Sequence, residues 1–295
     1  MTGTLDGRTV GVVGLGNMGV PMAALLGAAG ARVRGYDVSA AALEAFAAAV
    51  PGAEVAGSAA DTAAGAEVVL LILPNSAVVE SVVGDGLAEA LEPGAVLVDM
   101  SSSEPPRTVA LAATLADDGK VLVDAPVSGG VSGARAGTLA VMAGGPDDAV
   151  RAVWPVFEAM GRPRHVGAVG AGHALKALNN LMSAAHLLAS SEAILAGQRF
   201  GLDPAVMLEV VNRSSGRSGS TENKWPNYVL PGTFDAGFAV ELMVKDLHIA
   251  LDLAEGMGGP ARHAAATVRL WDEAAAALPP GSDHTAIVRY LRGEP

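Results

Sequence analysis

The chain of 295 residues contains no cysteine. It can therefore form no disulfide, thiolate zinc site, iron–sulfur cluster or cysteine nucleophile, and this absence favours a cytoplasmic protein. Basic residues are also few, because 19 Lys and Arg stand against 31 Asp and Glu and leave a formal net charge of −12. Nucleic-acid binding depends on clustered Lys and Arg side chains that contact phosphates, and the sequence has no basic stripe. We therefore expect no nucleic-acid partner.

Neither a signal peptide nor a membrane span is expected. The chain is 51% hydrophobic, but alanine and valine spread along its length supply much of this content, as in the buried elements of a globular protein. Asp6 and Arg8 lie where a signal peptide would have its apolar core. The length is enough for about two domains.

Short strand-like runs alternate with alanine-rich segments through the first half of the chain. The runs are nearly continuous and apolar, as in strands buried on both faces, and helix-length segments separate them. The expected strands are residues 9–13, 32–36, 68–73, 96–99, 121–124 and 139–142. This alternation predicts an α/β N-terminal domain with a doubly wound parallel sheet.

The pattern changes after about residue 165. Residues 171–200 contain neither proline nor a strand-like run and predict one long helix. Further helices are expected at 203–212, 238–256 and 260–278. We place the domain boundary in the glycine-rich segment 161–172. This placement gives domain 1–165 and an all-α domain 166–295, joined by the helix at 171–200.

The first expected strand runs directly into Gly14-Leu15-Gly16-Asn17-Met18-Gly19, which has the spacing G-x-G-x-x-G. In a dinucleotide-binding turn the first glycine makes the turn, the second lets the backbone approach a pyrophosphate, and the third allows close helix packing. About 20 residues on, the second strand ends at Asp37, where a ribose 2′-hydroxyl would bind. Because a carboxylate repels a 2′-phosphate, the motif predicts NAD rather than NADP. The alternative is a strand–turn–helix corner that binds nothing.

Small and polar residues follow three further strands. Ligands of an open parallel sheet bind beyond the carboxyl ends of its strands, so Leu73-Pro74 and Ser101-Ser102 are candidate walls of the cofactor site. Ordinary turn and helix-capping chemistry explains these residues equally well. The segment 124–133 offers glycine-rich backbone N–H groups that suit a small anion, although a flexible connector would have the same composition.

The helix expected at 171–200 would carry a polar stripe on one face. Its members are His173, Lys176, Asn180 and Ser183. A lysine among apolar residues needs solvent, a partner or a substrate, so both a solvated face and a functional face fit the pattern. Lys245 follows Glu241 by four residues, and an ordinary helix ion pair explains it as well as a function does.

Taken in order, these motifs resemble those of the β-hydroxyacid dehydrogenases, a family that includes 3-hydroxyisobutyrate dehydrogenase and tartronate semialdehyde reductase. The shared motifs span nearly the whole chain. They are the glycine turn followed by Pro21-Met22-Ala23, DAPVSGG at 124–130, G-x-x-G-x-G-x-x-x-K-x-x-N-N at 167–180, and Lys245-Asp246. The resemblance implies a Rossmann domain, an interdomain helix, and a helical domain that builds a homodimer or homotetramer.

The resemblance also implies roles for individual residues. Lys176 would be the general acid and base that interconverts a small 3-hydroxy acid and its semialdehyde with NAD. No metal is implied. The expected cofactor-binding residues are Gly14, Leu15, Gly16, Asn17, Met18, Gly19, Asp37, Leu73, Pro74, Ser101, Ser102 and Lys245. The expected substrate-binding residues are Ser128, Gly129, Gly130, Asn180, Arg217 and Asp246.

One position departs from the family pattern, because Gly219 stands where enzymes of valine breakdown tend to carry tryptophan. A glycine at this position implies a roomier or differently shaped substrate pocket. Glycerate, threonate, serine and hydroxymethyl diacids therefore stay open as substrates.

Several other functions compete with this one. A tartronate semialdehyde or glyoxylate reductase, an imine reductase-like enzyme and a non-catalytic NAD-binding oligomer remain as alternatives. Imine reductases typically replace the catalytic lysine by aspartate or tyrosine, so Lys176 argues against them. Phosphogluconate dehydrogenases are longer and need a basic phosphate pocket. Serine and zinc hydrolysis are not expected, because the sequence has neither G-x-S-x-G nor H-E-x-x-H.

Overall fold

A computed structural model describes residues 4–294 of the chain. The chain divides into two compact units, residues 1–176 and 177–295, and the division falls inside helix α8 (Ala171–Phe200). Among the described residues, no helix combines the length and the apolar character that crossing a bilayer requires.

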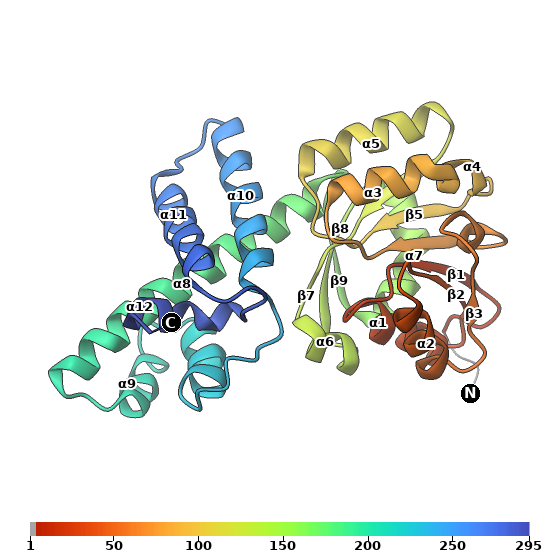
Figure 1. Cartoon of the computed structure of the whole chain (residues 1–295). Helices are drawn as coiled ribbons and strands as arrows, with labels where there is room; N and C mark the ends of the chain where they lie inside the picture. The colour runs from red at the N-terminus through yellow and green to blue at the C-terminus, as the bar shows by residue number, and fades with distance from the viewer. Residues whose placement is uncertain (1–3, 295) are drawn as a thin grey trace. The chain divides into compact units, whose positions relative to one another are not determined.

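The N-terminal unit is built on a nine-stranded sheet with the order β3-β2-β1-β4-β5-β6-β8-β7, and β9 pairs with β8 (Figure 1). The strands are β1 (Thr9–Val13), β2 (Arg32–Tyr36), β3 (Glu54–Val55), β4 (Val68–Leu71), β5 (Val96–Asp99), β6 (Val121–Asp124), β7 (Val127–Ser128), β8 (Leu139–Gly144) and β9 (Gly161–Gly167). All pairings from β3 across to β6 are parallel. The predicted parallel sheet is confirmed over this part.

The far edge of the sheet differs from the prediction. Strand β8 runs antiparallel to β6 and β7, whereas β9 runs parallel to β8. A parallel return needs a crossover of a dozen or more residues, and the helix between β7 and β8 has only seven. Strand β9 was not predicted, because its sequence GRPRHVG contains no apolar run. Its backbone hydrogen bonds to β8 place it in the sheet.

Helices cover both faces of this sheet, as a doubly wound fold requires (Figure 1). This two-sided cover follows from the sequence of the central strands. Every residue of β4 and β5 is buried, so both faces of the sheet need apolar partners. One core packs the sheet against Met22 and Phe157, and the other packs it against Val79 and Leu115. The covering elements are α1 (Gly19–Ala28), α2 (Ala40–Ala49), α6 (Gly130–Ala136) and α7 (Asp147–Met160) on one face, and α3 (Ser76–Val82), α4 (Ala88–Ala90) and α5 (Pro105–Asp117) on the other.

The C-terminal unit is helical, as predicted. Its core surrounds Trp225 and Trp271, both fully buried. The helix over 220–229 was not predicted, because Pro226 and its polar neighbours do not form a helical sequence pattern. The segment is a wide, π-type helix. The elements after α8 are α9 (Pro204–Val211), η3 (Ser220–Val229), α10 (Val240–Gly256), α11 (Arg262–Ala277), η4 (His284–Ala286) and α12 (Ile287–Arg292).

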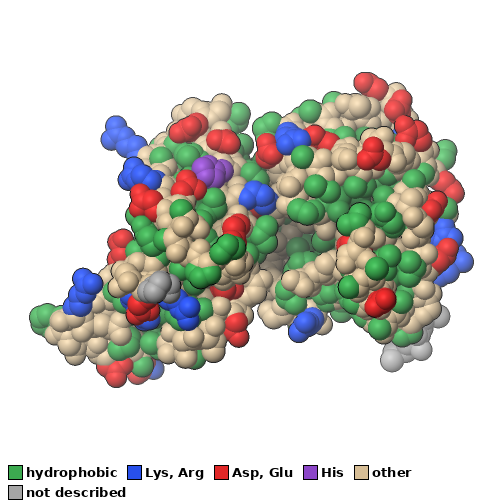
Figure 2. Space-filling model, viewed as in Figure 1, with side chains coloured by type: hydrophobic (Ala, Val, Ile, Leu, Met, Phe, Trp, Pro, Cys, Tyr) green, Lys and Arg blue, Asp and Glu red, His purple; other side chains and the backbone are tan. Residues whose placement is uncertain are grey.

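On the face shown in Figure 2, Lys and Arg side chains stand singly among Asp and Glu side chains. The described residues form no continuous basic area on that face.

Candidate functional site

The three glycines of the turn between β1 and α1 differ in their surroundings. Two of them pack against backbone atoms, and the third faces open space. Gly14 has φ +95°, and a Cβ on it would meet the Ile72 carbonyl oxygen at 2.2 Å. A Cβ on Gly19 would meet the Gly14 carbonyl oxygen at 1.9 Å. Around a Cβ built on Gly16, no atom lies within 4 Å in the described part of the chain. The protein's own packing therefore needs the outer two glycines, and a ligand approaching the backbone would need Gly16.

Asp37, at the end of β2, holds the glycine turn in place. Its Oδ2 accepts the Leu15 N–H at 2.7 Å, and its Oδ1 accepts the Ser39 N–H at 2.8 Å. The neighbouring Arg34 donates to both carboxylate oxygens of Glu54 at 2.8 and 2.9 Å. The carboxylate thus stands beside the turn that a dinucleotide would contact, while Arg34 is already paired.

A depression of about 670 Å³ lies beside the turn, between α1 and α2. Leu15, Gly16 and Asn17 form part of its wall, and Arg135 of α6 lines it as well. Asn17 is exposed and Met18 is partly buried. The turn is therefore open to a ligand from outside, as a pyrophosphate site needs.

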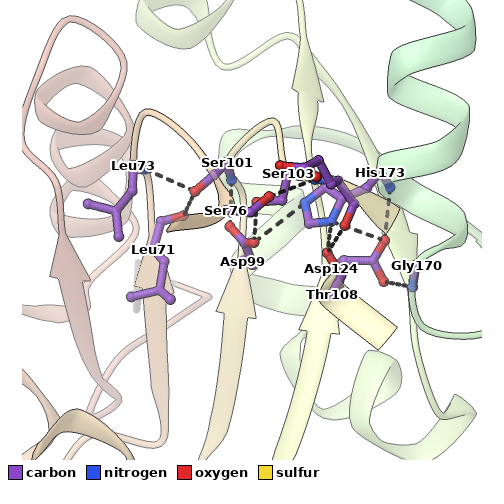
Figure 3. A network of polar contacts seen from close by, with 11 residues as sticks. Leu71, Leu73, Ser76, Asp99, Ser101, Ser103, Thr108, Asp124, Gly170 and His173 are labelled. Carbon is purple, nitrogen blue, oxygen red and sulfur yellow. Dashed lines mark hydrogen bonds and ion pairs between the residues drawn. The ribbon is translucent and has the colours of Figure 1, made fainter. Parts of the chain in front are cut away.

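The carboxyl ends of β4 and β5 are joined by hydrogen bonds (Figure 3). The Ser101 hydroxyl accepts the Leu73 N–H at 2.9 Å, and the Ser101 N–H donates to Asp99 Oδ1 at 2.9 Å. The structure thus brings together two of the residues expected to line the cofactor site. Pro74 is exposed and Ser102 is partly buried, each next to a member of this pair.

Asp124, at the end of β6, fixes the start of α8 (Figure 3). Its Oδ1 accepts the Gly170 N–H at 2.7 Å, and its Oδ2 accepts the His173 N–H at 2.9 Å. Burial raises the pKa of Asp124 above its usual range, although the His173 imidazole and these N–H groups act in the opposite direction. The carboxyl group is therefore a buried anchor for the first turn of α8.

The His173 side chain is buried in the same network. Its Nδ1 lies 2.8 Å from the Thr108 hydroxyl, and its Nε2 lies 3.7 Å from Asp99 Oδ2. His173 is therefore not part of a solvated face, and that interpretation of the polar stripe is wrong for this residue. Asp99 and Asp124 were not among the predicted site residues, although each ends a strand with the same sequence, Val-Leu-Val-Asp, and this repeated ending could have revealed them.

The glycine-rich segment after β6 is ordered rather than a flexible connector. Ser128 lies in β7 and pairs with Ala140 of β8. Gly129 (φ +134°) and Gly130 (φ +62°) then form the sharp bend that starts α6. The backbone around these residues is therefore held in one conformation.

In the C-terminal unit, α8 and α10 bring three expected site residues together. Asn180 Nδ2 donates to Asp246 Oδ2 at 2.6 Å, and Lys245 Nζ lies 2.9 Å from Asp246 Oδ1. Asn180 and Asp246 are buried. Glu241 accepts the Gly281 N–H at 2.8 Å, so its carboxylate has a structural role at the start of α10.

Lys176 is partly buried and lies four residues before Asn180 in α8, which puts both on one face of the helix. Arg217 is exposed, and the ion pair that the structure gives it is with Glu222 at 3.8 Å. Residues 4–294 contain no cluster of three or more His, Asp or Glu side chains able to hold a metal ion.

Comparison with known proteins identifies the family. Residues 9–172 match the NAD binding domain of 6-phosphogluconate dehydrogenase, and residues 170–291 match the NAD-binding model of NADP-dependent 3-hydroxyisobutyrate dehydrogenase. The chain is also 40% identical over 248 residues to 2-(hydroxymethyl)glutarate dehydrogenase of Eubacterium barkeri, covering 82% of this chain and 81% of that protein. The chain belongs to the β-hydroxyacid dehydrogenase family. It is an NAD(P)-dependent enzyme, and its N-terminal unit is the NAD-binding domain.

Other members of the β-hydroxyacid dehydrogenase family are similar over almost the full length. Human mitochondrial 3-hydroxyisobutyrate dehydrogenase is 35% identical over 297 residues, covering 97% of this chain and 87% of the human protein. The solved structure of Mycobacterium tuberculosis 3-hydroxyisobutyrate dehydrogenase with L-serine has a TM-score of 0.89 at 33% identity, covering 97% of this chain and 99% of that chain. The relatives are thus named for different hydroxy acids, and the reaction class is shared.

Proposed function

We propose that this dehydrogenase interconverts a small 3-hydroxy acid and its semialdehyde with NAD, using Lys176 as general acid and base. The observation that carries the proposal is the Asn180–Asp246–Lys245 cluster, whose Asn180 lies about one helical turn along α8 from Lys176. An amide and a cation held beside a lysine suit the binding of a hydroxy acid next to a proton-transfer group.

The residues around the glycine turn fit the cofactor. The open backbone at Gly16 would receive the pyrophosphate, Asp37 the adenosine ribose, and the Leu73–Ser101 pair the nicotinamide side. When bound, NAD supplies a hydride acceptor. The Asp37 carboxylate and the pairing of Arg34 with Glu54 support NAD over NADP, because neither would stabilise a 2′-phosphate.

The chain's own residues handle the proton and the substrate's charge. In the oxidising direction the neutral Lys176 amine accepts the proton of the substrate hydroxyl. In the reducing direction the Lys176 ammonium returns that proton to the aldehyde oxygen. Asn180 orients the hydroxyl group, and the bend at Ser128–Gly130 holds the substrate carboxylate through its backbone N–H groups.

An absorbance assay at 340 nm tests this function. Wild-type enzyme and Lys176→Ala are compared with NAD and NADP against a panel of 3-hydroxy acids. We expect turnover with NAD, weaker turnover with NADP, and a loss of kcat by orders of magnitude in Lys176→Ala with NADH affinity retained. Undiminished turnover in the variant contradicts the role of Lys176. NADH binding without turnover of any acid favours a binding protein instead.

The helical unit also supports self-association into a homodimer or homotetramer. Large apolar side chains are exposed at the end of α8 and along α9. They are Phe200, Leu202, Val206 and Val210. A second copy of the chain would cover them, as symmetric oligomers commonly do.

A further inference from the structure

The helical unit holds a second lysine, Lys224, in a position that the reaction does not explain. It lies in η3 beside the fully buried Trp225, and it is itself only partly exposed. Its Nζ donates to the Ser183 hydroxyl of α8 at 2.7 Å. Burial lowers the pKa of Lys224 to about 8, although the charge of Asp283 acts in the opposite direction.

The Lys224 ammonium makes no direct ion pair among the described residues. Within residues 4–294 no carboxylate oxygen lies within 4 Å of it, and the Ser183 hydroxyl is its one hydrogen-bond acceptor. The Asp283 carboxylate is already used, because it accepts N–H bonds from Gly237, Phe238 and Thr285. An ammonium has three donors, and a partly buried cation whose hydrogen bond within the protein goes to a neutral hydroxyl gains from an anion placed beside it.

Lys224 stands beside the proposed substrate residues. Ser183 follows Asn180 by three residues in α8, so the two side chains are neighbours on one helix face, about 4.5 Å apart along the axis. The Asn180–Asp246 pair and the Ser183–Lys224 pair are therefore anchored on α8 less than one helical turn apart.

We propose that Lys224 and Ser183 bind a second acidic group of the substrate, so that the preferred 3-hydroxy acid carries a carboxylate at both ends. This inference rests on the proposed function, because it extends the substrate site that Lys176 and Asn180 define. The rise from Lys176 to Ser183 is about 10 Å along α8, which suits a second carboxylate several bonds away from the reacting carbon. The ammonium would gain a direct ion pair with the substrate's second carboxylate.

Three matched substrates test the proposal. Each is a 2-(hydroxymethyl) carboxylic acid with the same chain, which ends in a carboxylate, a primary amide or a methyl group. We expect the wild-type enzyme to have the highest kcat/KM with the carboxylate-terminated acid. In Lys224→Met, the ratio of kcat/KM for this acid to that for the methyl-terminated acid should fall roughly 10- to 100-fold, as for loss of a charged hydrogen bond. Lys224→Arg should keep most of the ratio.

Matched variants separate a specific effect from a general one. Arg213→Met removes one positive charge at an exposed position of the same unit and should leave the ratio unchanged. Ser183→Ala removes the hydroxyl that holds the ammonium, and it should lower the ratio in the same direction even if Lys224→Met folds poorly. Glutarate should inhibit the wild-type enzyme more strongly than butyrate, and this difference should shrink in Lys224→Met.

The outcomes distinguish the two proposals. If the wild type shows no preference for the carboxylate-terminated acid, or the ratio survives in Lys224→Met and Ser183→Ala, the second acidic group is not bound there. Turnover that depends on Lys176 would still support the proposed function in that case. If no hydroxy acid is turned over at all, the proposed function itself fails.

Discussion

Gly16 and Gly19 lie three residues apart, and the structure requires glycine at each for a different reason. A side chain on Gly19 would strike the Gly14 carbonyl oxygen, which is a cost to folding. A side chain on Gly16 would enter open space, which is a cost only when a cofactor approaches. One motif therefore contains a folding constraint and a binding constraint that can be separated by mutation.

The first prediction is that Gly16→Val weakens NADH binding roughly tenfold or more while changing the free energy of unfolding by no more than about 0.5 kcal/mol. The reason is that the new side chain meets the cofactor but no protein atom. Fluorescence titration with NADH and denaturant unfolding measure the two effects. Gly19→Ala is the matched control and should instead destabilise the fold. Unchanged NADH affinity in Gly16→Val would contradict the pyrophosphate site.

A second prediction concerns Lys224. Its pKa is about 8 in the folded protein, below the ordinary lysine value, so the unfolded state binds more protons between pH 8 and about 10. The cost of holding the ammonium is therefore fully present below pH 8 and disappears as the pH rises through this window. Lys224→Met should raise the free energy of unfolding by about 1 to 3 kcal/mol at pH 7, with the gain shrinking toward pH 10. Thermal unfolding across pH, with Arg213→Met as control, measures this, and a gain independent of pH would argue against it.

At the scale of elements, the first turn of α8 is the point where the sheet meets the helix that carries Lys176. Two strand-end aspartates and Thr108 surround His173 there, and all four side chains are buried. Strand ends at the carboxyl edge of β5 and β6 thus set the position of this helix start. The direction of the Lys176 side chain depends on that anchor.

The third prediction is that His173→Ala lowers the free energy of unfolding by about 3 kcal/mol, because it removes the buried hydrogen bond to Thr108 and leaves a cavity beside the strand-end aspartates. It should also lower kcat, since the start of α8 loosens. His186 is an exposed histidine of the same helix, so His186→Ala is a matched control with little expected effect. Equal stability losses in the two variants would show that the buried network does not anchor the helix.

At the scale of the whole molecule, the exposed apolar residues of α8 and α9 concern assembly. Phe200 is 85% exposed and Val210 is 59% exposed, which is unusual for side chains of this size unless another surface covers them. All of these residues belong to the helical unit itself, at the end of α8 and in or near α9.

The fourth prediction is that Val206→Glu, which places a charge in the middle of this apolar area, dissociates the oligomer. Light scattering coupled to size-exclusion chromatography should show a mass near 29.4 kDa for the variant and a multiple of it for the wild type. Met257→Glu is the control, because Met257 is 77% exposed on another helix end. A wild-type protein that is already monomeric would contradict the proposed assembly.

The amino-acid sequence by itself determined the apolar strands of the sheet, the ligand turn and the long helix. Apolar runs such as Val68–Leu71 are short-range signals, and the G-x-G-x-x-G spacing places a ligand turn without knowledge of any distant contact. The same holds for the long helix α8, whose limits are those predicted. Elements with polar sequences, β9 and η3, were missed because backbone pairing and packing produce them.

Tertiary structure alone decided which polar side chains meet. His173 and Thr108 are 65 residues apart in the chain, and Lys224 and Ser183 are 41 apart. Local patterns carry no information about such pairs, because the hydrogen bonds form only after the strands and helices have packed. The burial that lowers the pKa of Lys224 has the same origin. A lysine in a polar stretch of sequence becomes a candidate binding group only once the fold has partly buried it beside Ser183.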